Sequence, residues 1–493
     1  MAARPIRAGR CARVATILFA FHCAGCGTLK AQDAAALPAA EDPPGRSPAV
    51  VDTNIVGVSQ AQPWNSHAQN TAIGQGDFGF PARYSGPNSL NRQGDVQETV
   101  TADLFAGVRL WPGAEAHLDF LMWQGFGLSQ TYGVEDFPNG DAYKAGTQTP
   151  NYTFAHLFVR QTIGLGGEQE AVPDAALTLA GKQDVSRLTV ALGRMSPLDF
   201  VDNNSYAGNP HTQFLNWAMM ANPTFDYGQD TVGYSTGIGI ELNRPTWALR
   251  YTFFQMPRDK NGFTGDDQFL MYPTRGSYGP FLRAWGMAAE YEQRYQIRRH
   301  PGAVRFLAWL DEADFASYGA ATAYLLANPP GPNAPAGSGA DVPASARAYR
   351  HKYGFGLNWE QEIAKNIGAF SRLGWCDGQE ETWTFTDIDY SASLGMSVNG
   401  GAWGRRDDTF GLAGIVGGAS RANQRFLEAG GEDMLDGDGK LNYGWEKALE
   451  TYYDFKVWWS VHLTADYQFV VDPAFNRDRG PVSILGARLH WQF

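Results

Sequence analysis

The sequence contains few cysteines. Of the four in 493 residues, Cys11, Cys23 and Cys26 lie close to the amino terminus, and Cys376 stands alone in the remainder. A single cysteine cannot form an internal disulfide framework, and the spacing of a zinc cluster is missing. The main part of the chain must therefore be stabilised by backbone hydrogen-bond ladders and, if it is a barrel, by lipid.

Long hydrophobic runs are also missing. After the first 30 residues, no apolar stretch approaches the roughly 18 residues that a membrane-spanning helix needs. The mean hydropathy of −0.33 is that of a soluble protein, yet 13% of the residues are aromatic. A β-barrel combines these two properties, because its strands are apolar on only one face. The net charge of −12 argues against nucleic acid as a partner, although it also suits a secreted soluble protein.

The amino terminus has the features of a secretory signal peptide. A basic segment precedes a short apolar stretch at residues 14–25, and Leu29-Lys30-Ala31 supplies a small-residue cleavage site. We therefore expect a signal peptide over residues 1–31 and a disordered lead-in, rich in Ala, Pro and Asp, over residues 32–63. Lipidation at Cys26 is the second interpretation, although Cys23 stands where leucine is usual in a lipoprotein box.

The last residues of the chain alternate in character. Every second side chain from Leu485 to Phe493 is apolar, and Arg488, His490 and Gln492 stand between them. This period of two predicts a β-strand with one dry and one wet face. A strand that finishes on an aromatic residue is common in bacterial outer-membrane barrels and rare in soluble sandwiches.

The same alternation recurs along most of the chain. Residues 100–110 and 116–122 each have one apolar and one polar face, and Pro112-Gly113 between them predicts a tight hairpin turn. Long connections are expected at 199–230 and 318–347, and the Pro- and Gly-rich tract at 328–337 is expected to be a surface loop. Further alternating segments lie at 155–160, 238–242, 247–253, 289–292, 304–310, 355–360 and, as one continuous strand, 457–469.

These segments predict an all-β fold. With weaker candidates included, we expect a transmembrane antiparallel β-barrel of about 16 strands over residues 64–493. The runner-up at this point is a soluble β domain, in which the polar faces would meet bulk water instead of a lumen.

The polar faces of the predicted strands carry the candidate pore-lining and substrate-binding residues. Charged planar groups hydrogen-bond hydroxyls, and aromatic rings such as Phe105, Phe158 and Phe370 stack on the apolar face of a sugar. Arg160 and Arg305 are expected in mid-strand, near the narrowest part of the lumen, as is Arg250. The alternative is a general water-filled pore whose charges only filter ions. The predicted set is Arg109, Glu115, His117, Asp119, His156, Arg160, Glu241, Arg250, Glu290, Arg305, Glu360 and Arg372.

Catalytic signatures are scarce. Pairs of carboxylates fall on alternating strands, where a solvated face is the simpler explanation, so no catalytic residue, cofactor or resident metal is predicted. The segment Asp436-Gly437-Asp438-Gly439-Lys440 resembles a fragment of a calcium loop, but the spacing to a bidentate glutamate fails. A turn rich in Asp and Gly is the favoured interpretation, and cation binding at Asp436 and Asp438 is left open.

Several stretches together resemble the carbohydrate-selective porins of the OprB family. Leu121-Met122-Trp123 and Cys376 depart from the family pattern, and the first lies on a predicted pore strand, which leaves the sugar preference open. The resembling stretches lie between Trp64 and Phe493 and include Tyr84-Ser-Gly-Pro-Asn-Ser-Leu90, Gly107-Val-Arg-Leu-Trp-Pro-Gly113, Asp202-Asn-Asn-Ser-Tyr206, His211-Thr-Gln-Phe-Leu-Asn-Trp217 and Gly437-Asp-Gly-Lys-Leu-Asn-Tyr443.

The resemblance implies a sixteen-stranded barrel in the outer membrane of a Gram-negative bacterium. Such a protein has no enzymatic activity and takes up monosaccharides such as glucose passively and selectively. The implied partners are monosaccharides, outer-membrane lipid and lipopolysaccharide, and a homo-oligomer is left open. A general porin, a porin preferring sugar acids or anions, and a secreted soluble carbohydrate-binding β protein remain as alternatives.

The resemblance also implies that the loop at residues 202–217 folds inward and narrows the channel. Its candidate constriction residues are Asp202, Asn203, Tyr206, Gln213 and Trp217.

Overall fold

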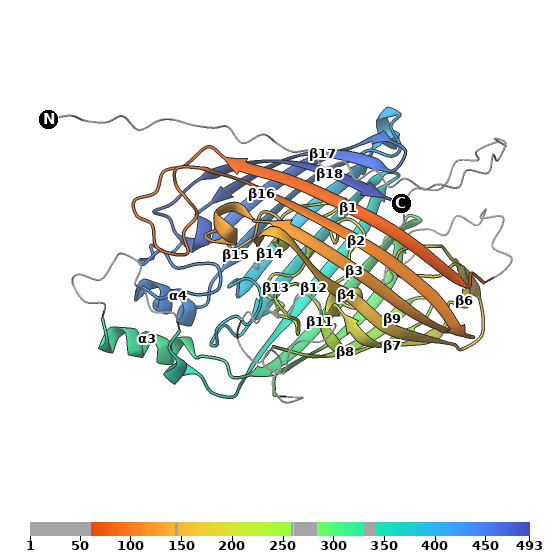
Figure 1. Ribbon diagram of the computed structural model, residues 1–493, viewed down its shortest axis with the longest axis horizontal. Helices are drawn as coiled ribbons and strands as arrows, with labels where there is room; N and C mark the ends of the chain where they lie inside the picture. The colour runs from red at the N-terminus through yellow and green to blue at the C-terminus, as the bar shows by residue number, and fades with distance from the viewer. Residues whose placement is uncertain (1–60, 143–145, 258–259, 261–282, 330–341) are drawn as a thin grey trace. The chain divides into compact units, whose positions relative to one another are not determined.

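The computed structural model describes residues 61–142, 146–257, 260, 283–329 and 342–493, all within one compact unit. Sixteen strands close into an antiparallel barrel in the order β1-β18-β17-β16-β15-β14-β13-β12-β11-β10-β9-β8-β7-β4-β3-β2 (Figure 1). The predicted all-β barrel of about sixteen strands is thus confirmed. A separate hairpin, β5 (Gln169–Val172) and β6 (Gly181–Asp184), lies between β4 and β7 in the chain.

The barrel strands have the following bounds: β1 (Trp64–Asp77), β2 (Asp95–Trp111), β3 (Ala114–Gly125), β4 (Thr147–Gly164), β7 (Arg187–Met195), β8 (Ser235–Asn243), β9 (Trp247–Gln255), β10 (Trp285–Ile297), β11 (His300–Ala313), β12 (Arg350–Ala364), β13 (Ile367–Cys376), β14 (Tyr390–Asn399), β15 (Thr409–Gly418), β16 (Glu446–Trp458), β17 (Val461–Val471) and β18 (Val482–Gln492).

Connections of two kinds distinguish the two ends of the barrel. At the turn end, neighbouring strands join through short turns such as residues 112–113, 298–299 and 365–366. Arg298 and Arg299 both have positive φ, at 51° and 72°, which gives a two-residue hairpin the twist of its flanking strands. At the other end, which we call the loop end, the connections are longer. In outer-membrane barrels the short turns face the periplasm and the long loops face the exterior.

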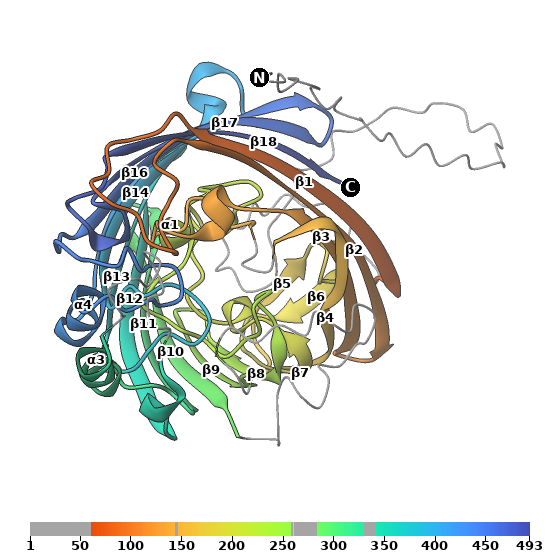
Figure 2. The same ribbon diagram turned by 60° about the vertical axis from the view of Figure 1, so that its left-hand side comes forward.

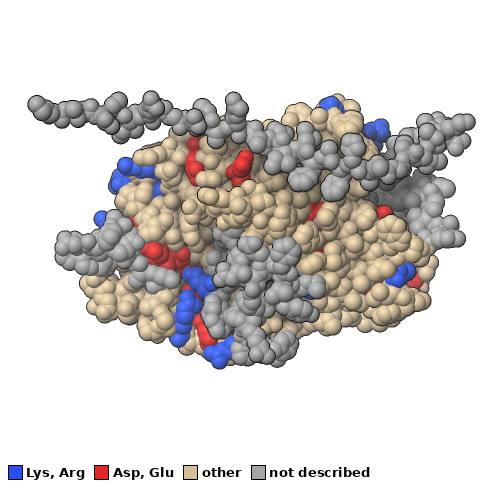
Figure 3. Space-filling view, in the orientation of Figure 1, with Lys and Arg blue, Asp and Glu red and all other residues tan. Residues whose placement is uncertain are grey.

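Burial follows the alternation along strands such as β2 and β9. In β2, Leu104 and Val108 are 59% and 45% exposed, whereas Asp103 and Phe105 are 5% and 8% exposed. Figure 3 shows few charged side chains over the strands on the face in view. Apolar residues therefore line the outer face, which lipid would cover, and polar residues point inward.

The prediction that residues 457–469 form one strand is wrong. β16 ends at Trp458, and Trp459 turns the chain into β17 with a φ of 46°. A bulge just before the turn sets the register so that odd-numbered residues pair, as Phe455 does with Leu463. Odd-numbered residues therefore face outward in both β16 and β17. The alternation in the sequence continues across the turn and does not reveal it.

Two helices pack together at the loop end, and neither was predicted. α3 (Tyr318–Ala327) occupies the start of the connection expected to be a loop, and α4 (Arg421–Glu428) lies beside it. The rings of Tyr318 and Phe426 join them at a centroid distance of 5.5 Å. None of the helices in the described ranges is long and apolar enough to cross a membrane.

Some predictions fall outside the described residues. These are the signal peptide, the alternative lipidation at Cys26, nearly all of the lead-in, and most of the Pro- and Gly-rich tract at 328–337.

Candidate functional site

The connection between β7 and β8, residues 196–234, folds into the barrel, and we call it the inner loop. It opens with a capping box: Ser196 accepts a hydrogen bond from the Leu198 N–H, and Asp199 accepts one from the Ser196 N–H at 2.9 Å. A short helix, α1 (Trp217–Met220), follows, and Figure 2 shows it inside the ring of strands. The inner loop contains the predicted constriction segment, which therefore lies inward, as predicted.

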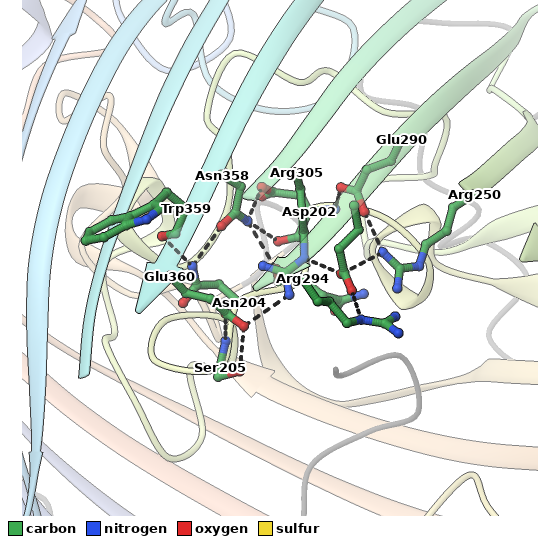
Figure 4. A network of polar contacts seen from close by, with 12 residues as sticks. Asp202, Asn204, Ser205, Arg250, Glu290, Arg294, Arg305, Asn358, Trp359 and Glu360 are labelled. Carbon is green, nitrogen blue, oxygen red and sulfur yellow. Dashed lines mark hydrogen bonds and ion pairs between the residues drawn. The ribbon is translucent and has the colours of Figure 1, made fainter. Parts of the chain in front are cut away.

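Asp202 anchors the inner loop to three strands. Its N–H donates to Glu290 of β10 at 2.7 Å, and its carboxylate accepts from Asn358 of β12 at 2.8 Å (Figure 4). The same carboxylate accepts from Arg372 of β13 at 3.0 Å, and Arg372 also donates to the Ala207 carbonyl at 2.8 Å. Asp202 has a φ of 60°, a backbone conformation that asparagine and aspartate tolerate better than most residues. The contacts with β10, β12 and β13 therefore fix the backbone of the inner loop at Asp202.

A row of alternating charges crosses the inner face from β8 to β12 beside this anchor. Each arginine in it lies between glutamates, with nitrogen–oxygen distances of 2.7 to 3.1 Å. Arg250 and Arg305 are only 3% and 1% exposed. The guanidinium groups are therefore shielded from bulk water, and the neighbouring glutamates compensate their positive charge. Glu360 also accepts the Ser205 N–H of the inner loop at 2.7 Å. We define the charge row as Glu241, Arg250, Glu290, Glu292, Arg305 and Glu360.

The inner loop continues along the wall to β16 and β18. Glu450 of β16 accepts the N–H groups of Leu215 and Asn216 at 2.6 and 3.0 Å. Arg488 of β18 donates to the carbonyl groups of Pro210 and Gln213, both at 2.7 Å. The charge row and the inner loop together occupy the inner face from β8 round to β18, which we call the covered side.

The predicted constriction residues have different environments within the inner loop. Gln213 hydrogen-bonds the backbone of the loop itself, at 2.8 Å from the nearest N–H donor. Trp217 is 7% exposed and stacks on Phe385 of another connection at 4.5 Å. Asn203 and Tyr206 are half-buried. Tyr206 packs against a cluster of buried hydrophobic residues, so Tyr206 and Trp217 are held by packing and Gln213 by hydrogen bonds within the loop.

On the other side of the barrel, the inner loop contacts β4. His156 of β4 lies between Asp119 of β3, at 2.9 Å, and Asp199 of the inner loop, at 3.0 Å. The ring of Tyr234, near the end of the inner loop, stands edge-on to the His156 ring at 5.0 Å. Asp199 and Tyr234 are both half-buried. We call Asp119, His156, Asp199 and Tyr234 the meeting point, and β1 to β7 the open side.

The connection between β3 and β4, residues 126–146, also reaches the inner loop. His211 contacts Asp141 at 2.8 Å, and the Trp217 N–H donates to the Phe137 carbonyl at 2.9 Å. Burial opposes a charge on His211, but the Asp141 carboxylate outweighs it and raises the pKa of His211 above its usual value. The tip of the inner loop is therefore held by an ion pair.

Four of the predicted residues form one group at the turn end. Glu115 contacts Arg109 at 3.1 Å, Arg160 at 2.7 Å and His117 at 3.1 Å. The prediction that Arg160 lies in mid-strand is wrong, because it pairs in register with Glu115 beside the turn. The visible alternation at 155–160 is only the last part of a longer strand, whose first half does not alternate.

A second segment, residues 165–186, enters the barrel at the turn end. It carries the β5–β6 hairpin, which Figure 2 shows inside the ring of strands. Leu177 of this segment is 4% exposed and packs with Phe105 and Phe158, and its carbonyl accepts from Arg160 at 3.0 Å. The lumen on the open side is thus narrowed from both ends.

Several inward residues lie outside the predicted pore-lining set. Arg488 and Glu292 fall on polar faces that the alternation predicts, and the period of two could also have identified Glu450. Asp199 and Tyr234 belong to the irregular inner loop, where no periodic signal exists. The meeting point therefore combines residues that sequence patterns reveal with residues that they cannot.

Comparison with known proteins agrees with this architecture. The family described as carbohydrate-selective porin, OprB family, matches residues 87–493. The high-pH structure of Pseudomonas putida OprB matches with a TM-score of 0.63 and 14% identity, over 87% of this chain and 94% of that chain, which supports the fold alone. No curated protein sequence matches the chain.

Two further structures are less similar. The low-pH structure of the same Pseudomonas putida protein has a TM-score of 0.45 and 11% identity, over 87% of this chain and 93% of that chain. The outer membrane channel DcaP of Acinetobacter baumannii has a TM-score of 0.45 and 6% identity, over 87% of this chain and 97% of that chain.

Proposed function

The chain belongs to the OprB family of carbohydrate-selective porins, and from that premise we propose that it conducts neutral monosaccharides such as glucose by passive diffusion. The family and the closed barrel imply a channel in the outer membrane of a Gram-negative bacterium. A closed barrel with an apolar outer face is not the architecture of the secreted soluble protein considered from the sequence.

The observation that carries the proposal is the pairing of charge inside the barrel. Along the charge row, each arginine contacts at least two carboxylates, and at the turn end Glu115 contacts two arginines. Arg187 and Arg294 also contact glutamates of the row, so its four carboxylates meet four guanidinium groups. Paired charges offer little net attraction to an ion that must leave its hydration shell in a narrow pore. A neutral sugar, in contrast, can exchange water for fixed donors and acceptors.

We place sugar recognition at the meeting point. Asp199 offers carboxylate oxygens to hydroxyl groups, and Tyr234 offers an aromatic face of the kind that stacks on a pyranose ring. Both side chains are half-buried, so a solute in the lumen can reach them. The group at the turn end, in which Arg109 and Arg160 are half-buried, is proposed to line the path beyond the meeting point.

A porin that prefers anions or sugar acids is the second candidate. It would need arginines that face the lumen without carboxylate partners. Arg250 and Arg305 face several glutamates instead and are almost completely buried, which favours the neutral substrate.

Liposome swelling tests the proposal. We expect faster uptake of glucose than of mannitol, an uncharged polyol of nearly equal size, and slower uptake of gluconate and of a disaccharide. Equal rates for glucose and mannitol would remove the claim of sugar selectivity. Faster uptake of gluconate than of glucose would establish the anion-preferring alternative.

A further inference from the structure

Three connections at the loop end bring buried carboxylates together. Glu135 lies in the connection between β3 and β4, Asp387 between β13 and β14, and Asp436 between β15 and β16. One oxygen from each lies within 4.8 Å of the other two. The three residues are 0%, 1% and 1% exposed, and we call them the carboxylate triad.

The hydrogen bonds of the triad leave carboxylate oxygens without donors. One oxygen of Glu135 accepts the Asp387 N–H at 2.7 Å, and the other has no hydrogen-bond partner in the described ranges. Asp436 is the clearer case, because it is buried and neither of its oxygens has a partner among the described residues. A buried carboxylate without donors is costly, so a bound cation or a proton must satisfy it.

Two members of the triad have no direct basic partner. Within the described ranges, neither Glu135 nor Asp436 has a basic side chain at ion-pair distance. Lys260 lies in the same region but contacts Asp433 and Glu381, the latter at 3.3 Å. Glu135 and Asp436 therefore place carboxylate oxygens in a buried site without a direct basic partner among the described residues.

The ligand chemistry is that of a hard divalent cation. The triad offers only oxygen atoms, and one oxygen of each carboxylate lies within 4.8 Å of the other two, which allows one Ca²⁺ with ligands at about 2.3–2.6 Å to contact all three. Mg²⁺ dehydrates reluctantly and usually keeps several waters, so a site built from protein oxygens favours Ca²⁺. A neutral oxygen is also near: the Asn423 amide donates to the Asp387 carbonyl at 3.5 Å, and its own oxygen has no partner in the described ranges.

We propose that Glu135, Asp387 and Asp436 bind one calcium ion at the loop end. The ion would tie together three connections that are far apart in the chain. The backbone carbonyl of Asp136, next to Glu135, accepts the Ala218 N–H of α1 at 3.2 Å, so the ion would also support the segment against which the inner loop rests. The site is separate from the meeting point and does not depend on the proposed sugar path.

Calorimetry on the whole protein tests the proposal directly. Protein refolded in detergent without lipopolysaccharide is treated with a chelator and titrated with CaCl₂, and separately with MgCl₂. We expect one calcium per chain, weaker binding of magnesium, and a higher temperature for the loss of the folded, heat-sensitive gel band when calcium is present. An unchanged band and no heat of binding in the wild type would show that the triad holds a proton instead, which overturns the proposal.

Variants identify the ligands. Asp436→Asn keeps the side-chain volume and removes the charge, and we expect it to lower calcium affinity at least tenfold. Glu428→Gln, an exposed acidic residue of α4 in the same connection, is the matched control and should bind calcium as the wild type does. Equal affinity in Asp436→Asn and the wild type would refute the assignment. If Asp436→Asn does not fold, Asp387→Asn and the wild-type titration decide the question, and glucose flux of the wild type remains an independent measurement.

Discussion

The covered and open sides of the barrel interior use similar residue types for different purposes. On the covered side, Arg250 and Arg305 are almost fully buried and paired, and the inner loop is fastened across the wall by its backbone groups. On the open side, Asp199 and Tyr234 stay half-buried around a single histidine. The difference indicates that most inward charges position the inner loop, whereas the few at the meeting point can contact a solute.

Breaking the charge row should have the largest effect. Arg250→Ala leaves Glu241, Glu290 and Glu292 without their shared cation, and losing one partner of a buried ion pair costs on the order of 3–5 kcal/mol. We expect a lower free energy of unfolding in denaturant titration and a pore more selective for cations in planar bilayers. Arg421→Ala, which removes an exposed arginine of α4, is the control. Unchanged unfolding and ion selectivity in Arg250→Ala would show that the row does not support the covered side.

Releasing the anchor should have the next largest effect. Asp202→Ala removes the acceptor for Arg372 and Asn358, and lost hydrogen bonds to charged groups contribute about 1.5–3 kcal/mol. The inner loop should then leave the wall, so a disaccharide should enter liposomes faster relative to glucose. Asp202→Asn keeps one acceptor oxygen and should give an intermediate rate. Disaccharide exclusion equal to the wild type in both variants would mean that other contacts hold the loop.

Changes at the meeting point should affect selectivity more than stability. Tyr234→Leu removes an aromatic face, worth about 1 kcal/mol, and should reduce glucose block of ion current about fivefold. Tyr234→Phe keeps the ring and serves as the matched control. Glucose block that is equally strong in Tyr234→Leu and the wild type would place recognition elsewhere, with the half-buried Arg109 and Arg160 at the turn end as the next candidates.

The smallest effect should come from His211. Its pKa is raised in the folded protein, so the contact with Asp141 stabilises the fold fully below the usual histidine pKa of about 6.5 and is lost as the pH rises through the raised pKa. The melting temperature of His211→Asn should therefore fall below that of the wild type at pH 6, by an amount corresponding to about 1 kcal/mol or less. At pH 10 the two proteins should melt together. An identical difference at both pH values would exclude titration of this pair.

Much of the barrel could be predicted from alternation, because a period of two records which face of a strand meets lipid. The inward placement of Asp119, Arg250 and Glu290 follows from that rule alone. The position of a residue along its strand does not follow from this rule, because the same alternation of odd and even residues holds at both ends of the strand. Alternation therefore predicts the wrong position along the strand for Arg160, and it does not detect the turn at Trp459.

The remaining features depend on contacts between segments that are distant in the sequence. Asp202 meets Arg372 across 170 positions, and no local pattern of residues specifies that contact. The carboxylate triad likewise joins three connections, so the spacing of Asp436 and Asp438 alone suggested only a turn. The family resemblance supplied the inward fold of residues 202–217, which alternation could not.

The pairing of β1 with β18 has a consequence for assembly. Every other neighbouring pair in the barrel is formed by barrel strands that follow one another in the chain, so hairpins can add one at a time. β1 must wait with one unpaired edge until the final residues are present, when Ala68 and Phe493 exchange backbone hydrogen bonds at 3.0 and 2.8 Å. Such an edge readily accepts a foreign strand. The interval before closure is therefore when the chain is most exposed to aggregation, and substitutions in β1 that slow closure should lower yield without altering the mature channel.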